Sequence, residues 1–252
     1  MSKSAIGSFS FTRLTLHSSE ELSHDVKKLR FAFPDPDTRS GLPLTSAVVS
    51  VSFPPGNGRW TPVFRPYTPT SDPDEPGFIE FMIKLYPNGK QSTLMHSLKP
   101  GDSLYFFKVP SVVWKPNQYR RVVLIAGGAG ITPMYQLLKG ILSNPEDQTQ
   151  VTLVWGVNSD ADLFLKDEFA HLKAHHPAQF QSHYVVSHPV EGSQHEKGYV
   201  TKEVLQRVGL AGVGTSGMRV LLCGPPAMEN ALTAKGGPLI QLGFSTAQIE
   251  KF

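Results

Sequence analysis

The sequence predicts two domains, an N-terminal antiparallel β-barrel followed by a C-terminal parallel α/β domain. Three observations lead to this prediction. The chain has 252 residues, of which 40% are hydrophobic, and this is enough apolar material for two cores of ordinary size. Before residue 118 short β-like runs alternate with Gly/Pro turns, whereas after it apolar runs alternate with helix-like segments. The sequence contains no internal repeat, so a repeat architecture is not indicated.

The N-terminal part has the pattern of strands separated by tight turns. Its β-like runs are TSAVVSVSF (45–53), GFIEFMIKLY (77–86) and DSLYFFKV (102–109). Residues with a high preference for strands dominate these runs, and helical periodicity is scarce between them. Such a pattern is typical of an antiparallel barrel or sandwich. We expect this domain to span residues 8–115.

The C-terminal part alternates strands with helices. Its apolar runs are VVLIAG (122–127), VTLVWGV (151–157), SHYVVS (182–187) and RVLLCG (219–224). The segments PMYQLLKGIL (133–142), LFLKDEFAHLKAHH (163–176) and TKEVLQRVG (201–209) have helical periodicity. This alternation predicts a Rossmann-like parallel sheet over residues 118–252, with a linker in VPSVVWKPNQY and the boundary near Lys115 to Gln118.

Charge and cysteine content restrict the function classes. The formal net charge is +3, and basic and acidic residues are interspersed, so strong nucleic-acid binding is not indicated. The single cysteine, Cys223, excludes an internal disulfide framework and any multi-cysteine metal site. No stretch approaches the roughly 18 apolar residues that cross a bilayer, and the N-terminus is not a signal peptide or presequence. We therefore expect the chain as given to be soluble.

A glycine turn links the first apolar run of the α/β domain to a helix. The glycines of this turn are Gly127, Gly128 and Gly130. Thr132 is a good N-cap and Pro133 a good first helical residue, so the free N–H groups of the helix start face the turn and can bind an anion. The spacing departs from the usual dinucleotide-binding fingerprint, because a proline replaces its third small residue. A turn that merely links strand and helix remains the alternative.

The segment LLCGPPAMENAL (221–232) repeats this arrangement. A strand ends, the chain turns through Gly224 and two prolines, and a helix begins near Ala227. Cys223 is then expected at the carboxyl edge of a strand, where ligands of open parallel sheets bind. A polarizable thiol at this place can contact a flat ring. The alternative is a small buried hydrophobic residue without a role in chemistry.

These motifs resemble those of the NADH-cytochrome b5 reductases, ferredoxin-reductase-like flavoenzymes, and most closely the fungal mitochondrial form. The resemblance covers nearly the whole chain. It extends through KKLRF (27–31), RPYTPTS (65–71), IKLYPNGKQS (83–92), LIAGGAGITPMYQL (124–137), GYVTKE (198–203), CGPPAM (223–228) and LGFSTAQIEKF (242–252). The resemblance implies an FAD-binding barrel and an NAD(P)H-binding α/β domain.

The resemblance assigns the Arg-x-Tyr-Thr sequence to FAD. It implies that Arg65 pairs with the pyrophosphate, Tyr67 packs along the flavin and ribityl chain, and the Thr68 hydroxyl lies near flavin N5. A guanidinium fork suits two phosphate oxygens, and a hydroxyl near N5 supports the atom that receives a hydride. An ion pair from Arg65 to Asp72 or Asp74 is the structural alternative. The neighbouring Pro66 is counted with this site.

A second FAD contact is expected at the turn NGKQS and its short helix STLMHSL. The residues that this part of the resemblance assigns to cofactor binding are Ile83, Lys84, Tyr86, Gly89, Lys90, Gln91 and Ser92. Among them, Lys84 matches a family lysine near the nicotinamide nucleotide. The phosphate is expected to contact backbone N–H groups and the Ser92 hydroxyl. Relatives usually have methionine at Gln91, and we expect this difference to be tolerated. Read alone, the segment is an Asn-Gly turn with a helix cap, and Lys84 a solvated strand charge.

The α/β domain is expected to bind NADH. The resemblance places the pyrophosphate at the 127–133 turn and the nicotinamide beside Cys223, Gly224, Pro225 and Met228. Ala129 replaces a common threonine of this motif. The residue position that usually carries an aspartate for the adenine ribose holds Ser187 here, while Asp160 and Asp162 keep the preceding loop acidic. We expect Asp162 and Ser187 to line the ribose site and NADH to be preferred, with some tolerance of NADPH.

The implied reaction is hydride transfer from NADH to FAD, with Thr68 and Cys223 in catalytic positions, followed by release of single electrons to a haem acceptor. Cytochrome b5 is the first candidate. The alternatives are a reductase module of a larger nitrate-reductase-like system and a degenerate flavin- or nucleotide-binding sensor. His171 and His175 have zinc-like spacing but no evident third ligand, so we expect no metal.

The resemblance also implies a monomer and a cellular location. Relatives reach the mitochondrial outer membrane, the intermembrane space or the endoplasmic reticulum through an N-terminal anchor. We expect any membrane attachment to depend on a segment that is absent from this chain, and a cytosol-facing protein where that anchor is missing.

Overall fold

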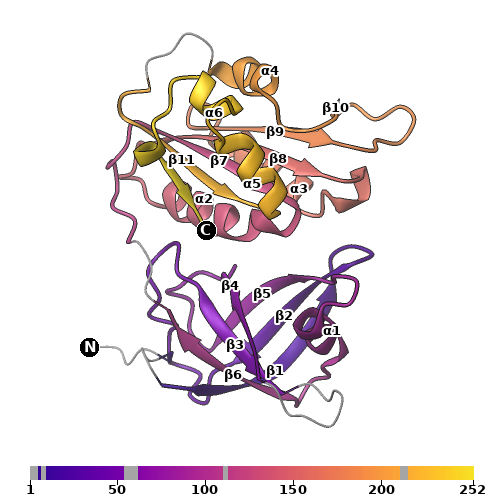
Figure 1. Cartoon of the computed structure of the whole chain (residues 1–252). Helices are drawn as coiled ribbons and strands as arrows, with labels where there is room; N and C mark the ends of the chain where they lie inside the picture. The colour runs from indigo at the N-terminus through magenta and orange to yellow at the C-terminus, as the bar shows by residue number, and fades with distance from the viewer. Residues whose placement is uncertain (1–4, 7–9, 54–61, 110–112, 211–214) are drawn as a thin grey trace. The chain divides into compact units, whose positions relative to one another are not determined.

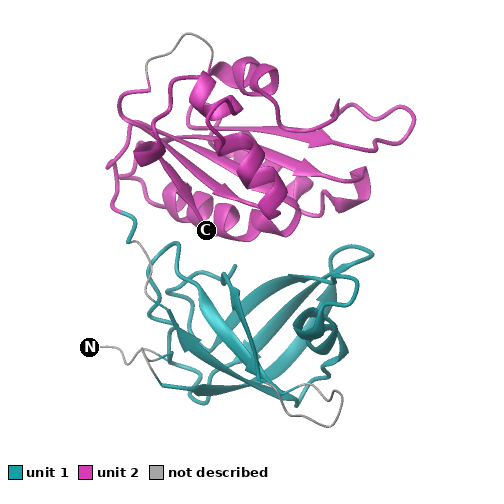
Figure 2. Ribbon diagram, in the orientation of Figure 1, with its two compact units in different colours: residues 1–114 teal, residues 115–252 magenta. Residues whose placement is uncertain are grey.

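The computed structural model describes residues 5–6, 10–53, 62–109, 113–210 and 215–252. The chain divides into two compact units, residues 1–114 and residues 115–252 (Figure 2). Residue 8, the predicted start of the barrel domain, and residues 110–112 of the predicted linker lie outside the described residues. Within the described ranges, no helix is both long enough and apolar enough to cross a membrane.

Unit 1 is an antiparallel sheet of six strands in the order β4-β3-β6-β1-β2-β5, curled as Figure 1 shows. The strands are β1 (Thr12–Glu21), β2 (Val26–Ala32), β3 (Val48–Ser52), β4 (Val63–Tyr67), β5 (Phe78–Lys84) and β6 (Ser103–Lys108), and helix α1 (Lys90–Ser97) follows β5. The predicted antiparallel β-barrel domain is confirmed.

Alternation of side chains builds the core of unit 1. Along β5 every second residue is buried, as expected for a strand with one face toward a core. The rings of Phe81 and Phe106 stack with centroids 5.4 Å apart, and Phe31 meets Phe106 edge to face at 5.1 Å. Tyr67, at the end of β4, packs against this same core. The core therefore holds one end of the expected FAD motif in place.

Unit 2 is a parallel sheet of six strands in the order β10-β9-β8-β7-β11-β12. The strands are β7 (Arg121–Gly127), β8 (Gln150–Val157), β9 (Phe180–Val186), β10 (Glu196–Lys197), β11 (Met218–Cys223) and β12 (Ile249–Lys251). The helices are α2 (Ile131–Ser143), α3 (Lys166–His175), α4 (Lys202–Leu205), α5 (Pro226–Thr233) and α6 (Pro238–Gln241). Short turns of helix are η1 (Gly128–Gly130), η2 (Asp160–Asp162), η3 (Gln206–Leu210) and η4 (Thr246–Gln248).

Helices cover both faces of this sheet, which explains its continuous apolar strands. Figure 1 shows α2 and α3 on one side and α4, α5 and α6 on the other. In β7 all residues from Val122 to Gly127 are buried. The predicted Rossmann-like α/β domain is confirmed.

The strand order reverses at β7, since β8 follows it on one side and β11 lies on the other. Ligands of open α/β sheets bind at such a reversal, beyond the carboxyl ends of the strands. Strand β7 ends at Gly127 and β11 at Cys223, and Ala126 pairs with Cys223 in the parallel register. The topology therefore brings the two glycine turns of the sequence to one place.

Candidate functional site

Arg65 lies near the end of β4, exposed and without a carboxylate partner among the described residues. Its Nη1 donates a hydrogen bond to the carbonyl oxygen of Phe64 at 2.8 Å. The alternative ion pairs are not formed. Asp74 lies 3.9 Å from the Arg39 guanidinium, and the Asp72 carboxylate accepts the N–H of Asp74 at 2.9 Å. The guanidinium of Arg65 can therefore bind an anionic ligand such as a pyrophosphate.

Tyr67 and Thr68 offer neutral groups next to this charge. The Tyr67 ring meets Phe81 edge to face, with centroids 6.4 Å apart. Burial raises the pKa of Tyr67 to about 12, against the opposing effect of the Arg65 charge, so the phenol remains protonated at neutral pH. Thr68 is half-buried, and its hydroxyl has no hydrogen-bond partner within the described part of the chain. This hydroxyl is available to a bound ligand.

The loop after Thr68 is attached to strand β5 at Glu80. The backbone N–H of Thr70 donates to the Glu80 carbonyl oxygen at 2.9 Å, and the N–H of Glu80 donates to Ser71 Oγ at 3.1 Å. Both Thr70 and Ser71 are buried. These bonds explain the hydroxyl residues of the RPYTPTS stretch, because they hold the arginine and tyrosine in a rigid setting.

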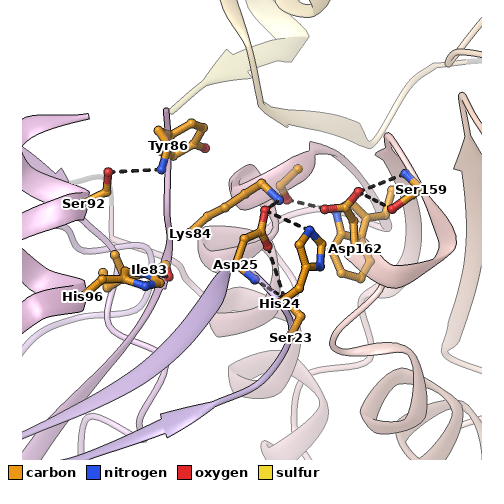
Figure 3. A network of polar contacts seen from close by, with 12 residues as sticks. Ser23, His24, Asp25, Ile83, Lys84, Tyr86, Ser92, His96, Ser159 and Asp162 are labelled. Atoms are coloured by element: carbon orange, nitrogen blue, oxygen red, sulfur yellow. Dashed lines mark hydrogen bonds and ion pairs between the residues drawn. The ribbon is translucent and has the colours of Figure 1, made fainter. Parts of the chain in front are cut away.

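Helix α1 begins after Gly89 without a side-chain cap. The first N–H groups of a helix have no partner inside the helix, so they can bind a phosphate. A Cβ on Gly89 would lie 2.4 Å from Ser92 Oγ, which explains the glycine. Ser92 Oγ accepts the N–H of Tyr86 at 3.2 Å and donates to the Gly89 carbonyl at 3.1 Å (Figure 3). Both hydrogen bonds of the Ser92 hydroxyl are thus made within the loop before the helix. The backbone N–H groups of Lys90 and its neighbours remain as the candidate donors to a phosphate.

The other expected cofactor residues, on β5 and in the turn after it, have different environments. The Ile83 side chain is in the core, 1% exposed, so any contact of this residue with a cofactor would be made by its backbone. Its carbonyl oxygen lies 2.8 Å from Nε2 of His96, which makes His96 a packing residue. Lys84 pairs through Nζ with the Asp25 carboxylate, as Figure 3 shows, and is not the freely solvated strand charge of the alternative. Tyr86 is half exposed.

The two glycine turns of unit 2 interlock. A Cβ on Gly130 would lie 2.1 Å from the carbonyl oxygen of Cys223, and a Cβ on Gly224 would lie 3.1 Å from Cα of Gly127. A Cβ on Gly127 would lie 2.6 Å from Sδ of Met228. The backbones of the two turns approach each other more closely than side chains would allow. The glycines are therefore required for the shape of the site.

Helix α2 starts earlier than the sequence suggests. The turn η1 runs directly into the helix, so Gly130 is the N-cap and Ile131 the first residue. Thr132 and Pro133 are then the second and third residues, and the prediction of Thr132 as N-cap is wrong. The Thr132 hydroxyl donates to the Ala129 carbonyl at 3.2 Å instead. The helix start has no side-chain cap, but the Ile131 N–H donates back to the Gly128 and Ala129 carbonyls and Pro133 has no N–H, so the N–H groups of the glycine turn itself are the candidate donors to a pyrophosphate.

Trp155 is a site residue that the motifs did not indicate. The side chain is fully buried on β8, and its Nε1 donates to the Gly128 carbonyl at 3.0 Å. Gly128 has φ of +51°, a conformation that favours glycine. The hydrogen bond from the indole therefore fixes the position of the glycine turn. A tryptophan in the apolar run VTLVWGV was the available signal, because a buried indole N–H requires an acceptor.

Cys223 ends strand β11, as predicted, with its thiol half-buried. Burial raises the pKa of this thiol to about 12, and the charge of Glu229 adds to the effect. The Glu229 carboxylate accepts the N–H of Gly224 at 3.1 Å and so supports the turn that follows. A thiol of this kind is neutral, which suits contact with a flat ring and not nucleophilic chemistry.

The acidic residues expected near the adenine ribose are engaged in structural contacts. The Asp162 carboxylate accepts the N–H and the hydroxyl of Ser159, each at 2.9 Å, and caps its own turn η2 (Figure 3). The Asp160 carboxylate accepts the Val190 N–H at 2.9 Å and orders the loop after β9. Its pKa is lowered, mainly by a hydrogen bond from the Ser193 hydroxyl. Ser187 directly follows β9 and is half-buried. Its hydroxyl donates to the Asn158 carbonyl oxygen at 3.3 Å and lies 3.0 Å from Nδ1 of His188.

Comparisons with known proteins cover both units. The model described as "Oxidoreductase FAD-binding domain" matches residues 13–114, and "Oxidoreductase NAD-binding domain" matches residues 124–234. The chain is 42% identical, over 98% of its length, to "NADH-cytochrome b5 reductase 2" of Emericella nidulans, of which 79% is covered. Identity to the protein of the same name from Phaeosphaeria nodorum is 41% over 98% of this chain and 76% of that protein.

A solved structure agrees with the whole fold. The cytochrome b5 reductase domain of Ulva prolifera nitrate reductase superposes with a TM-score of 0.89 at 26% identity, covering 99% of this chain and 100% of that one. These similarities confirm the resemblance carried by the sequence motifs. The chain belongs to the NADH-cytochrome b5 reductase family, and it is an oxidoreductase with an FAD-binding and an NAD-binding domain.

Proposed function

We propose that this protein takes a hydride from NADH onto FAD and passes single electrons to cytochrome b5. The observation that supports the proposal is that each unit of the chain has a candidate site for one cofactor. Unit 1 presents the exposed Arg65 guanidinium and an uncapped helix start, and unit 2 presents interlocked glycine turns at the reversal of a parallel sheet. The cytochrome b5 acceptor follows from the family to which the chain belongs.

In unit 1 the residues bind and orient FAD. When bound, FAD supplies a flavin ring that accepts a hydride and releases electrons one at a time. Arg65 pairs with the pyrophosphate, together with backbone N–H groups at Lys90 and Gln91. Tyr67 packs its neutral ring along the cofactor, and Thr68 donates its hydroxyl toward flavin N5. Pro66, Lys84, Tyr86 and Gly89 shape the surrounding walls.

In unit 2 the residues hold NADH. The glycine turn and the start of α2 bind its pyrophosphate through N–H groups, and Thr132 and Pro133 belong to that first helical turn. Cys223, Gly224, Pro225 and Met228 contact the nicotinamide. Ser187 contacts the adenine ribose, on the loop that Asp160 supports, and Asp162 lies in the acidic turn η2 that precedes it in the sequence. Orientation of the reacting atoms is the main contribution to the rate.

The proposal is tested by anaerobic stopped-flow absorbance of the purified protein. NADH should bleach the visible flavin band rapidly, and NADPH should do so much more slowly, since no arginine pair is evident for a 2′-phosphate. Oxidised cytochrome b5, added next, should be reduced at its haem. A flavin that neither nucleotide bleaches would contradict the proposal and support a degenerate binding protein.

The second candidate function is that of a reductase module for a larger electron-transfer system. It is favoured by the similarity, over the full length of both chains, to the reductase domain of a nitrate reductase. The same experiment distinguishes the two, because such a module would be bleached by NADH but would transfer electrons poorly to free cytochrome b5.

Cys223→Ser should retain FAD and slow flavin reduction by NADH about tenfold. A hydroxyl is smaller and less polarizable than the thiol it replaces, so the nicotinamide loses a contact that orients it, and small misplacements of reacting atoms have large effects on rate. The rate of flavin bleaching at saturating NADH measures the effect. Because the thiol pKa is about 12, the pH profiles of both proteins should keep the same shape below about pH 9.

An unchanged rate of flavin reduction in Cys223→Ser would return the thiol to a packing role. Flavin content is the internal control, since Cys223 lies in unit 2 and the proposed FAD residues lie in unit 1.

We further propose, from the family resemblance, that the protein is a monomer and is located at the mitochondrial outer membrane or the endoplasmic reticulum. Light scattering tests the oligomeric state, and cell fractionation tests the location.

A further inference from the structure

Gln91 forms a buried polar network that links helix α1 to strand β3. Its side chain is 3% exposed. Nε2 donates to Ser50 Oγ at 2.9 Å, and Oε1 accepts a hydrogen bond from Ser52 Oγ. Ser50 and Ser52 are themselves buried, at 0% and 4% exposure. Both ends of one amide are therefore satisfied by two hydroxyls on the inner face of a single strand.

The network continues to the strand that carries Arg65. Ser50 and Arg65 face each other in the antiparallel register of β3 and β4. Ser50 Oγ donates to the Arg65 carbonyl oxygen at 3.4 Å, a long and partly buried hydrogen bond. Helix α1 also contacts β4 and β5 directly. A chain of hydrogen bonds thus runs from the first turn of α1, through one amide and one hydroxyl, to the backbone of the arginine.

We propose that Gln91 is a positioning residue, which sets the spacing between the two elements that bind the FAD pyrophosphate. The inference rests on the proposed FAD site. One element is the uncapped first turn of α1, and the other is the Arg65 guanidinium on β4. Two groups bind one pyrophosphate tightly only when their separation is held, because any search for the right geometry costs entropy. Gln91 supplies this constraint through hydrogen bonds, without touching the cofactor through its side chain.

The buried position of the amide makes this constraint specific. An amide removed from water must keep its partners, so the helix can dock on β3 only in the register that satisfies both serines. An apolar side chain of similar length would fill the space but would allow the helix to shift along the strand. Relatives usually carry methionine at this position, but in this chain a methionine would leave the buried hydroxyls of Ser50 and Ser52 without their amide partner. Gln91→Met is therefore the informative change, since it keeps the volume and removes the hydrogen bonds.

Titration of the apoprotein with FAD, followed by flavin fluorescence, tests the proposal without any measurement of activity. Gln91→Met should weaken FAD binding about tenfold. Gln136→Met, at a glutamine that is also 3% exposed but lies on α2 in unit 2, should leave FAD affinity unchanged. Unfolding of each apoprotein by denaturant shows that both variants are folded.

A double-mutant cycle separates positioning from a general loss of stability. If Gln91 acts by placing Arg65, Gln91→Met should weaken FAD binding much less in an Arg65→Ala background than in the wild type. Equal effects in both backgrounds, or no effect of Gln91→Met alone, would overturn the proposal. An Arg65→Ala variant that binds FAD as well as the wild type would instead refute the proposed FAD site itself.

Gln91→Glu provides a rescue by a conservative variant. A protonated carboxyl group can donate to Ser50 and accept from Ser52 as the amide does, whereas a buried carboxylate cannot donate. Burial raises the pKa of a carboxyl group, so the protonated form persists at mildly acidic pH. FAD affinity of this variant should approach that of the wild type at low pH and fall as pH rises. The same pH response in wild type and Gln91→Glu would contradict the network.

Discussion

We expect Arg65→Ala to yield a folded protein that loses FAD on dilution. The guanidinium is exposed and has no carboxylate partner in the described part of unit 1, so its removal breaks no ion pair of the fold. A charge-assisted hydrogen bond to an anion contributes about 1.5–3 kcal/mol, which corresponds to roughly ten- to hundredfold in affinity. Two phosphate oxygens share this one guanidinium, so we expect the upper part of that range. The ratio of flavin to protein after gel filtration measures the loss.

The matched control is Arg13→Ala. Arg13 is also an exposed arginine on a strand of unit 1, facing Tyr105 of β6 in the register, and it lies outside every proposed cofactor contact. Both variants lose one positive charge, so an effect of the change in net charge alone would appear in both. Flavin content should fall only in Arg65→Ala. Equal flavin content in the two variants would remove Arg65 from the site.

The fold was predictable because each unit follows its local pattern. Apolar residues alternate along β5 and run continuously along β7, and these two patterns belong to a half-exposed and a doubly covered strand. The structure divides the chain between residues 114 and 115, next to the predicted boundary at residues 115–118. Such patterns report burial, and burial is set by the sheet to which a strand belongs.

The partners of the site side chains could not be predicted from local sequence. Gln91 bonds to Ser50, 41 residues away, and Lys84 pairs with Asp25, 59 residues away. These contacts depend on the register between strands and on how α1 docks on the sheet. The VSVS pattern of β3 carried a signal, since two serines on the inner face of a strand require buried partners.

The start of α2 shows a different limit. Pro133 is compatible with the first helical residue, but a proline also fits elsewhere in the first turn, where an N–H has no helical partner. Gly130 adopts φ −61° and ψ −2°, close to helical values, so the turn continues smoothly into the helix. Because glycine accepts many conformations, the sequence does not reveal which one it adopts.

Gly130→Ala should abolish efficient use of NADH while FAD remains bound. The backbone of Gly130 is in a conformation that alanine adopts without strain, so conformational energy does not cause the effect. The added Cβ would lie 2.1 Å from the carbonyl oxygen and 2.5 Å from the carbonyl carbon of Cys223. Both neighbours are backbone atoms, so the two turns must move apart. Overpacking costs about 1–3 kcal/mol, and we expect the Kd for NADH to rise at least about tenfold.

Gly236→Ala is the control for this change. Gly236 lies in an exposed turn of the same unit, and a Cβ there would meet nothing within 4 Å. Titration with NADH under anaerobic conditions, and the rate of flavin bleaching, should be impaired only in Gly130→Ala. Flavin content should match the wild type in both variants, since the proposed FAD residues belong to unit 1. Unimpaired NADH binding in Gly130→Ala would mean that the pyrophosphate does not bind at the interlocked turns.

A substitution at the neighbouring Gly128 shows whether NADH affinity depends on the distance between the two turns or on the backbone conformation of a single glycine. Its φ of +51° disfavours any other residue, yet a Cβ there would meet nothing within 4 Å. Gly128→Ala therefore strains the backbone without separating the turns, and we expect a smaller loss of NADH affinity than in Gly130→Ala. The distance between the turns, more than the conformation of any one glycine, would then determine whether the nucleotide binds.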